Sequence, residues 1–145
     1  MTGPIASAIV YGTFPLDRAS ARRRDPARLA AARADPATRL VPVWRGKNLI
    51  HPGAAPVAAR PAGPAAAPLW VWAGEAIFLG IDAGGSWFAL DVSDREEAEL
   101  LPLIAACAPG ASFLELRPVS PLLAASEAAV LAAARGFVHW HRASR

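Results

Sequence analysis

The sequence holds a single cysteine, Cys107, among its 145 residues. One cysteine excludes an internal disulfide and a multi-cysteine metal site within these residues. The chain also lacks an apolar run of the roughly 18 residues that a membrane span needs, and it lacks the basic start and apolar stretch of a secretory signal. We therefore expect a cytoplasmic protein that makes no contact with a membrane.

The sequence has little that indicates catalysis. Its glycines match neither a nucleotide-phosphate loop nor a dinucleotide-binding loop, and its serines lack the context of a nucleophile elbow. His139 and His141 are two residues apart in a predicted helix, about 200° around its axis, so they cannot bind one metal ion together. Nothing marks Cys107 as an activated nucleophile. We predict no catalytic residue, no metal ligand and no cofactor in this chain.

Lysine is almost absent, since all but one of the 15 basic side chains are arginine. With the abundant alanine and proline, this is typical of GC-rich coding and indicates a bacterial protein. Residues 1–68 hold ten of the basic side chains and three of the 12 acidic ones. Arg22, Arg23, Arg24 and Arg28 form a candidate basic patch for RNA or a nucleotide. The other interpretation, a solvated helix face, is favoured because no aromatic residues interleave with the arginines.

The order of the predicted elements indicates an α+β fold, with a mixed or antiparallel sheet flanked by helices. The Asp25-Pro26 pair starts the second short helix and the Asp35-Pro36 pair ends it. Ser93 with Glu96 forms a capping box that starts a later helix, which Pro102 should end or kink. The predicted elements are an extended arm at 1–15, helices at 17–24 and 26–34, a hairpin of strands 39–44 and 48–51, strands at 69–72, 76–81 and 87–92 in a meander, a helix from 93, a strand at 112–116, and a helix at 120–143.

Two boundaries follow from composition. Residues 52–68 are almost wholly alanine, proline and glycine, so we predict a flexible insertion without a folded element. The length suits one domain, which we place at 16–145 after the arm. Its last helix carries an apolar stripe, because Leu123, Val130 and Phe137 recur at seven-residue intervals.

Five groups of residues carry a family resemblance. They are Asp17-Arg18-Ala19, Arg24-Asp25-Pro26 with Leu29-Ala30, Pro42-Val43-Trp44-Arg45-Gly46, the pair F-L-G-I-D and F-A-L-D-V-S, and a terminal A-R-x-x-x-x-W-H-R made by Ala134, Arg135, Trp140, His141 and Arg142. In this order they resemble the N-terminal, Nudix-like domain of bacterial NADH pyrophosphatases, which are NAD diphosphatases of the Nudix superfamily. The resemblance runs from about Leu16 to Arg142.

The resemblance implies a larger enzyme around this domain. In that family, the W-H helix leads into a four-cysteine zinc ribbon and then into a catalytic Nudix domain. The complete homodimeric enzyme hydrolyses NAD(H) to nicotinamide mononucleotide and AMP, and removes NAD caps from RNA, with water activated at Mg²⁺ or Mn²⁺. The expected partners of this chain are therefore a downstream zinc ribbon, a Nudix domain and a second copy.

A cluster of acidic residues partly matches the glutamates of the metal-binding Nudix box. Its members are Asp94, Glu96, Glu97 and Glu99. The match is incomplete, because the box requires glutamate, glutamate and glycine at the positions of Trp87, Leu100 and Pro102. Acids in a first helical turn also favour the positive end of the helix dipole, and we prefer that interpretation.

Three functions remain open. The leading hypothesis is a non-catalytic domain that packs on the catalytic part and shapes the dimer. A stand-alone, arginine-rich module that binds RNA or a nucleotide is the alternative, and a Nudix enzyme active by itself is the least favoured. For the leading hypothesis the candidate interface is Phe137, Val138, Trp140 and His141, with the three apolar side chains partly exposed.

Overall fold

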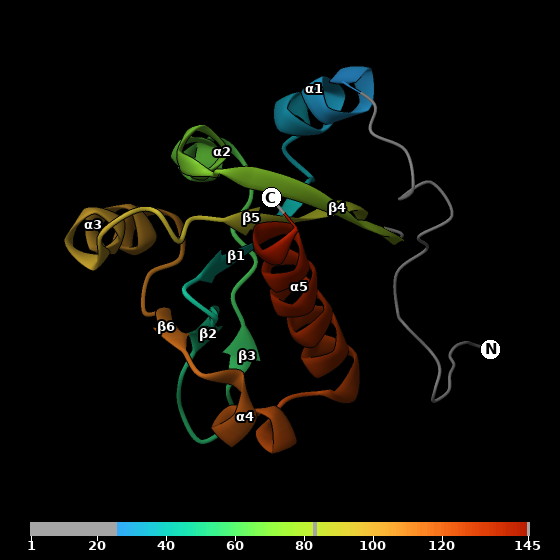
Figure 1. Ribbon diagram of the computed structural model, residues 1–145. Coiled ribbons are helices and arrows are strands. Elements are labelled where there is room, and N and C mark those ends of the chain that lie inside the picture. Colours follow the sequence, from blue (N-terminus) through green and yellow to red (C-terminus); the bar gives the residue numbers. More distant parts are fainter. Residues whose placement is uncertain (1–25, 83, 145) are drawn as a thin grey trace.

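The computed structural model describes residues 26–82 and 84–144 (Figure 1). The predicted arm at 1–15 and helix at 17–24 lie outside the described residues. Within them the fold is α+β, as predicted. A mixed sheet of six strands is flanked by helices, and the C-terminal helix is the longest of these.

The sheet is built around a parallel pair of strands, β1 and β5. Its strand order is β3-β2-β1-β5-β4, and β6 also pairs with β2. All pairs other than β1 and β5 are antiparallel. The strands are β1 (Arg39–Trp44), β2 (Lys47–His51), β3 (Val57–Ala58), β4 (Glu75–Asp82), β5 (Gly85–Asp91) and β6 (Ser112–Leu114).

Both predicted hairpins are present. Trp44 pairs with Lys47 across a two-residue turn in which Arg45 has φ 50° and Gly46 has φ 80°. Positive φ at both central residues matches the right-handed twist of the flanking strands. The second hairpin joins β4 to β5 and carries a bulge between Phe78 and Gly80.

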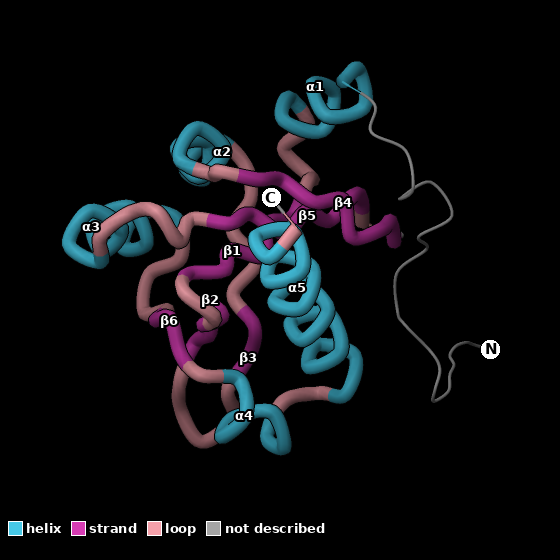
Figure 2. Tube along the Cα trace, viewed as in Figure 1, coloured by secondary structure: helices cyan, strands magenta, loops and turns pink. Residues whose placement is uncertain are grey.

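Helices cover the sheet on both faces (Figures 1 and 2). The last helix lies across one face, and the first three lie on the other. The helices are α1 (Pro26–Ala34), α2 (Ala67–Trp72), α3 (Glu97–Cys107), α4 (Leu116–Val119) and α5 (Ala125–Ala143), with 3₁₀ turns η1 (Pro64–Ala66) and η2 (Ser120–Leu122). Among the described helices, none combines the length and the apolar character that a bilayer crossing demands.

Alternate residues of the central strands supply two cores. Val41, Trp87 and Ala89 pack with α5, whereas Phe88 and Leu90 pack with α1, α2 and α3. This alternation follows from the two-residue period of a strand, whose successive side chains point to opposite faces. The two helical layers therefore share one sheet.

The segment at 52–72 differs from the prediction. Residues 69–72 belong to helix α2 and not to a strand, because Pro68 lies in its first turn, where a proline's fixed φ suits a helix. The predicted meander is therefore reduced to the β4–β5 hairpin. The prediction that 52–68 has no folded element is also wrong, since β3 and η1 lie there and Ala58, Ala59 and Ala66 are buried.

Two helix starts were also misplaced. α3 begins at Glu97 with Glu96 as its N-cap, because the hydroxyl of Ser93 is taken by the backbone N–H of Arg45. Pro102 lies inside α3 without ending it, and both Pro102 and Ala98 are exposed, so the carbonyl left unpaired lies on the solvent side. The predicted start at Ser120 is replaced by η2, and α5 begins at Ala125.

Candidate functional site

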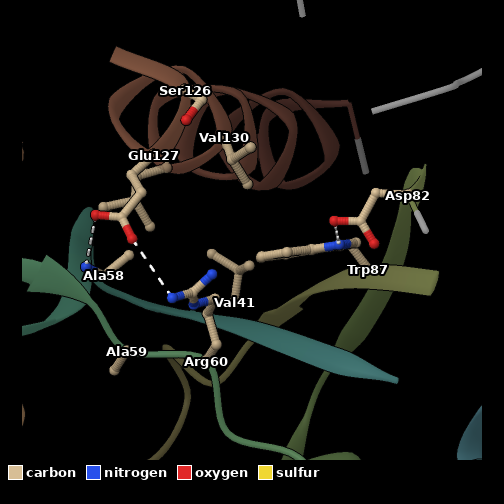
Figure 3. Close-up of a pocket in the computed structure, with 10 residues that line it drawn as sticks. Val41, Ala58, Ala59, Arg60, Asp82, Trp87, Ser126, Glu127 and Val130 are labelled. Carbon is tan, nitrogen blue, oxygen red and sulfur yellow. Dashed lines mark hydrogen bonds and ion pairs between the residues drawn. The ribbon is translucent and has the colours of Figure 1, made fainter. Parts of the chain in front are cut away.

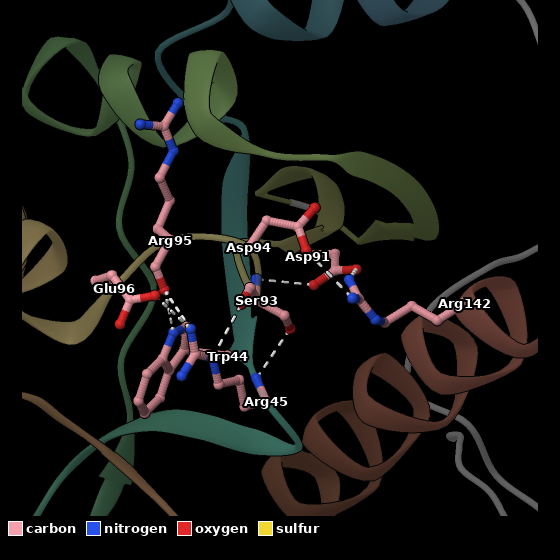
Figure 4. Close-up of polar contacts among 8 residues, drawn as sticks. All are labelled: Trp44, Arg45, Asp91, Ser93, Asp94, Arg95, Glu96 and Arg142. Carbon is pink, nitrogen blue, oxygen red and sulfur yellow. Dashed lines mark hydrogen bonds and ion pairs between the residues drawn. The ribbon is translucent and has the colours of Figure 1, made fainter.

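Three segments far apart in the sequence meet in one polar cluster (Figure 4). They are the β1–β2 turn, the loop between β5 and α3, and the last turn of α5. We call this the anchor cluster, and its members are Trp44, Arg45, Asp91, Ser93, Asp94, Arg95, Glu96 and Arg142. It brings together parts of the P-V-W-R-G, F-A-L-D-V-S and W-H-R motifs.

The centre of the anchor cluster is the ion pair between Arg142 and Asp91. Arg142 Nη1 donates to Asp91 Oδ2 at 2.7 Å, and Nη2 donates to Asp94 Oδ1 at 3.2 Å. The Asp91 side chain is only 1% exposed. The hydrogen bond to Asp91, followed by that to Asp94, raises the pKa of Arg142 above its usual range, so the guanidinium stays charged. The end of α5 is thereby fixed to the end of β5.

The cluster continues from Asp91 to the β1–β2 turn. Asp91 Oδ1 accepts from the backbone N–H of Ser93 at 3.0 Å, and Ser93 Oγ accepts from the backbone N–H of Arg45 at 2.9 Å. Arg45 Nε donates to the Ser93 carbonyl at 3.1 Å. The carbonyl of Arg95 accepts from Trp44 Nε1 at 2.8 Å. Two strand ends and one helix end are thus held by a continuous set of hydrogen bonds.

The acidic residues at the start of α3 serve as caps. Glu99 Oε1 accepts from the backbone N–H of Glu96 at 3.0 Å, and the Glu96 side chain accepts in return from the backbone of Glu99. Glu99 also pairs with Arg95 at 3.6 Å. This reciprocal capping satisfies two donors of the first helical turn. Within 26–82 and 84–144, no group of three histidine, cysteine, aspartate or glutamate residues is placed to hold a metal ion.

A groove of about 700 Å³ lies beside the anchor cluster, between α5 and the β1–β2 turn. Four basic residues line it, namely Arg45, Arg135, His139 and Arg142. Two of these arginines are already paired with carboxylates of the cluster. A Cβ at Gly136 would meet no atom within 4 Å, so the groove is open beside this residue.

The predicted interface on α5 is only partly exposed. Trp140 is 64% exposed, whereas Val138 is buried at 3% and Phe137 is half-buried against the α5 core. The prediction was therefore wrong for Val138, which faces the sheet because it lies one helical turn after the buried Ala134. His141 Nδ1 lies 3.8 Å from Glu75 Oε2.

The remaining candidates are of two kinds. Arg22, Arg23 and Arg24 lie outside the described residues. Arg28 lies in α1, but only the backbone of this residue is described. Cys107 is half-buried at the end of α3, and burial raises the pKa of its thiol. A thiol with a raised pKa holds less of the reactive thiolate, which is unlike an activated nucleophile.

Sequence reasoning did not find the pairing of Arg142 with Asp91. Both residues belong to motifs that carry the family resemblance. They are 51 residues apart, however, and their spacing does not indicate a contact. A buried aspartate requires a partner. The pair could therefore have been predicted by looking for an arginine at a helix end to match the aspartate at the end of a buried strand.

Comparison with protein families gives a match over most of the chain. A family model described as the NADH pyrophosphatase-like rudimentary NUDIX domain matches residues 37–140, from just before β1 to the last turns of α5. The match includes the sheet and most of the anchor cluster. No functionally curated protein matches the chain significantly.

Proposed function

The chain belongs to the family of NADH pyrophosphatase-like rudimentary NUDIX domains, and from this premise we propose that it is a non-catalytic scaffolding domain of an NADH pyrophosphatase. Its role is to pack on the catalytic part of that enzyme and to shape a homodimer. The complete enzyme is proposed to hydrolyse NAD(H) to nicotinamide mononucleotide and AMP, and to remove NAD caps from RNA.

The observation that carries the proposal is the exposed Trp140 at the end of α5, next to the point where the anchor cluster holds that helix. Arg142 fixes the end of α5 to the buried Asp91, two residues after an indole that is 64% exposed. Large aromatic side chains held in a fixed place are the commonest anchors of protein interfaces. A helix end held by two hydrogen bonds of Arg142 supports a docking role, because less backbone freedom remains to be lost on binding.

The acidic residues support the non-catalytic part of the proposal. A Nudix-type reaction needs carboxylates that are free to bind Mg²⁺ or Mn²⁺. In this chain Glu96 and Glu99 cap α3, Glu99 also pairs with Arg95, and Asp94 pairs with Arg142. Glu97 lies in the same helical turn, but within 26–82 and 84–144 no three such side chains are placed to hold one ion. These residues do not fit the catalytic metal, and we assign the metal and its chemistry to another domain.

Hydrolysis by the isolated chain tests the catalytic part. The 145-residue chain is incubated with NADH and either Mg²⁺ or Mn²⁺, and AMP is measured by chromatography. We expect no AMP above the protein-free control. Turnover that disappears in a Glu97→Gln or Glu99→Gln variant would place the active site in this chain and overturn the proposal.

Association tests the docking part. The oligomeric state of the chain is measured by light scattering across a dilution series, for the unmodified chain and for Trp140→Ala. We expect the variant to dissociate at a higher concentration than the unmodified chain, with an unchanged melting temperature, because an exposed side chain adds little to folding. Arg117→Ala, at an exposed position on α4 and not on α5, is the matched control. Equal behaviour of all three proteins, with no association, would remove Trp140 from the interface.

A further inference from the structure

A small pocket lies beneath the first two turns of α5, away from the anchor cluster (Figure 3). Its volume is about 140 Å³. It is lined by Val41 of β1, by Ala58, Ala59 and Arg60 at and after β3, by Asp82 and Trp87 of the β4–β5 hairpin, and by Ser126, Glu127, Val130 and Leu131 of α5. The space arises because alanines lie opposite the start of the helix, where larger side chains would fill the gap.

The interior of the pocket is apolar and flat on one side. Val41, Ala59 and Leu131 are almost fully buried. Trp87 Nε1 donates to Asp82 Oδ2 at 3.0 Å, which fixes the plane of the indole; Figure 3 shows the ring edge-on with Val130 above it. An apolar cavity of roughly 150 Å³ accommodates benzene in another protein. The size and walls of this pocket therefore suit a single flat ring.

The polar side of the pocket is formed by Arg60 and Glu127, which face each other in Figure 3. Arg60 Nη2 lies 3.7 Å from Glu127 Oε2, beyond the distance of an N–H···O hydrogen bond. Glu127 Oε1 accepts one long bond from the backbone N–H of Ala58, at 3.3 Å. The Glu127 side chain is only 18% exposed. A carboxylate can accept about four hydrogen bonds, so Glu127 keeps acceptor capacity for a ligand. The Arg60 guanidinium beside it also lies over the Trp87 ring, 5.9 Å from the ring centre, a cation–π contact that leaves its N–H donors available.

We propose that this pocket binds a small, neutral, flat ring that carries an adjacent N–H donor and carbonyl acceptor, such as an aromatic carboxamide or a lactam. The ring packs between Val130 and Trp87, the N–H donates to Glu127, and the carbonyl accepts from Arg60. An anionic ring of the same shape is disfavoured, because its carboxylate would lie against that of Glu127. The proposal goes beyond scaffolding and does not depend on it.

Benzamide and benzoate distinguish the proposal from unspecific apolar binding. The two probes have nearly the same shape, but only benzamide is neutral and carries a donor. They are titrated into the ¹⁵N-labelled 145-residue chain, and the backbone amides of Ala58, Ala59 and Leu131 and the indole N–H of Trp87 are followed by NMR. We expect benzamide to shift these signals with a Kd on the order of 1 mM, and benzoate to bind at least about tenfold more weakly. 2-Pyridone, with the same pair inside its ring, tells whether a lactam binds as well as a carboxamide.

Two variants test the roles of the polar and apolar sides. Glu127→Gln removes the charge at nearly constant size, so benzamide should weaken and benzoate should no longer be disfavoured. Val130→Phe fills the space and should abolish both shifts, with its melting temperature confirming that it folds. Glu115→Gln, an exposed glutamate that does not line the pocket, is the matched control. If Val130→Phe does not fold, the loss of the preference for benzamide over benzoate in Glu127→Gln decides alone.

Three results would overturn the proposal. The first is an absence of benzamide-induced shifts at the four pocket signals in the folded chain. The second is equal affinity for benzamide and benzoate, which would show that Glu127 takes no part. The third is unchanged benzamide binding in a folded Val130→Phe variant, which would place the probe elsewhere.

Discussion

Arg142 is held by two carboxylates that differ greatly in their exposure to water. Asp94 is largely exposed, so its pair with Arg142 is screened by solvent and contributes little. Asp91 is 1% exposed, and Arg142 and the Ser93 backbone are among the groups that compensate its buried charge. The stabilising effect of Arg142 therefore lies in keeping Asp91 paired.

Replacing Arg142 with alanine tests this assignment. We expect Arg142→Ala to lower the free energy of unfolding by about 2 kcal/mol, because it leaves a buried carboxylate without its cation. Adding Asp91→Asn should recover part of the loss, since the amide needs no counter-charge. Urea denaturation followed by circular dichroism measures both, with Arg117→Ala as an exposed control that should cost less than about 0.5 kcal/mol. A loss in Arg142→Ala no larger than the control's would show that Asp91 does not depend on Arg142.

Asn48 joins two elements, because it is buried in β2 and donates from Nδ2 to the carbonyl of Leu131 in α5 at 3.1 Å. Its Oδ1 is buried with no hydrogen-bond partner among the residues that the structure describes. Asn48→Asp keeps the shape but loses the donor and places a carboxylate against the Leu131 carbonyl. We expect a loss of at least about 3 kcal/mol in the free energy of unfolding.

A control on β6 separates burial from added charge in that measurement. Ser112→Asp adds the same carboxylate at an exposed sheet position, where we expect a cost below about 1 kcal/mol. Both variants are compared by urea denaturation. Equal effects of the two substitutions would mean that the contact between β2 and α5 is not needed for stability.

Local signals predicted those elements whose geometry is decided locally. The Asp25-Pro26 pair gave α1 with its correct bounds, and the Arg45-Gly46 turn gave the first hairpin. The residues of α2 were misassigned because Trp70, Val71 and Trp72 have high strand propensity, whereas the position of Pro68 and the burial of Leu69 favour a helix. Tertiary context decided between them.

Long-range contacts account for what local signals did not predict. Ser93 was expected to cap α3, but the parallel pairing of β1 with β5 brings Arg45 to its hydroxyl, and Glu96 caps the helix instead. The packing of α5 on the sheet brings Arg142 to Asp91 at the end of β5. A candidate site that depends on which strands are neighbours is therefore visible only in the fold, even when its residues are already present in recognisable motifs.

At the scale of the whole molecule, the sheet belongs to two cores at once. Val41 and Ala89 face α5, and their neighbours Leu40 and Leu90 face the layer of α1, α2 and α3. If either helical layer detached, the face of the sheet that it covers would be exposed to water. The same strands form the surface on which the other helical layer packs. The two cores should therefore unfold together, as single domains of this size usually do.

Matched substitutions in the two cores test this coupling. Leu131→Ala on α5 and Leu100→Ala on α3 each remove a nearly fully buried side chain, and each should cost about 2–5 kcal/mol. We expect both to lower the midpoint of one thermal transition, in which near- and far-ultraviolet circular dichroism coincide, because each destabilises the shared sheet. Leu122→Ala, at an exposed position, should leave the midpoint almost unchanged. A second transition in only one of the core variants would show instead that one helical layer detaches while the sheet and the other layer remain folded.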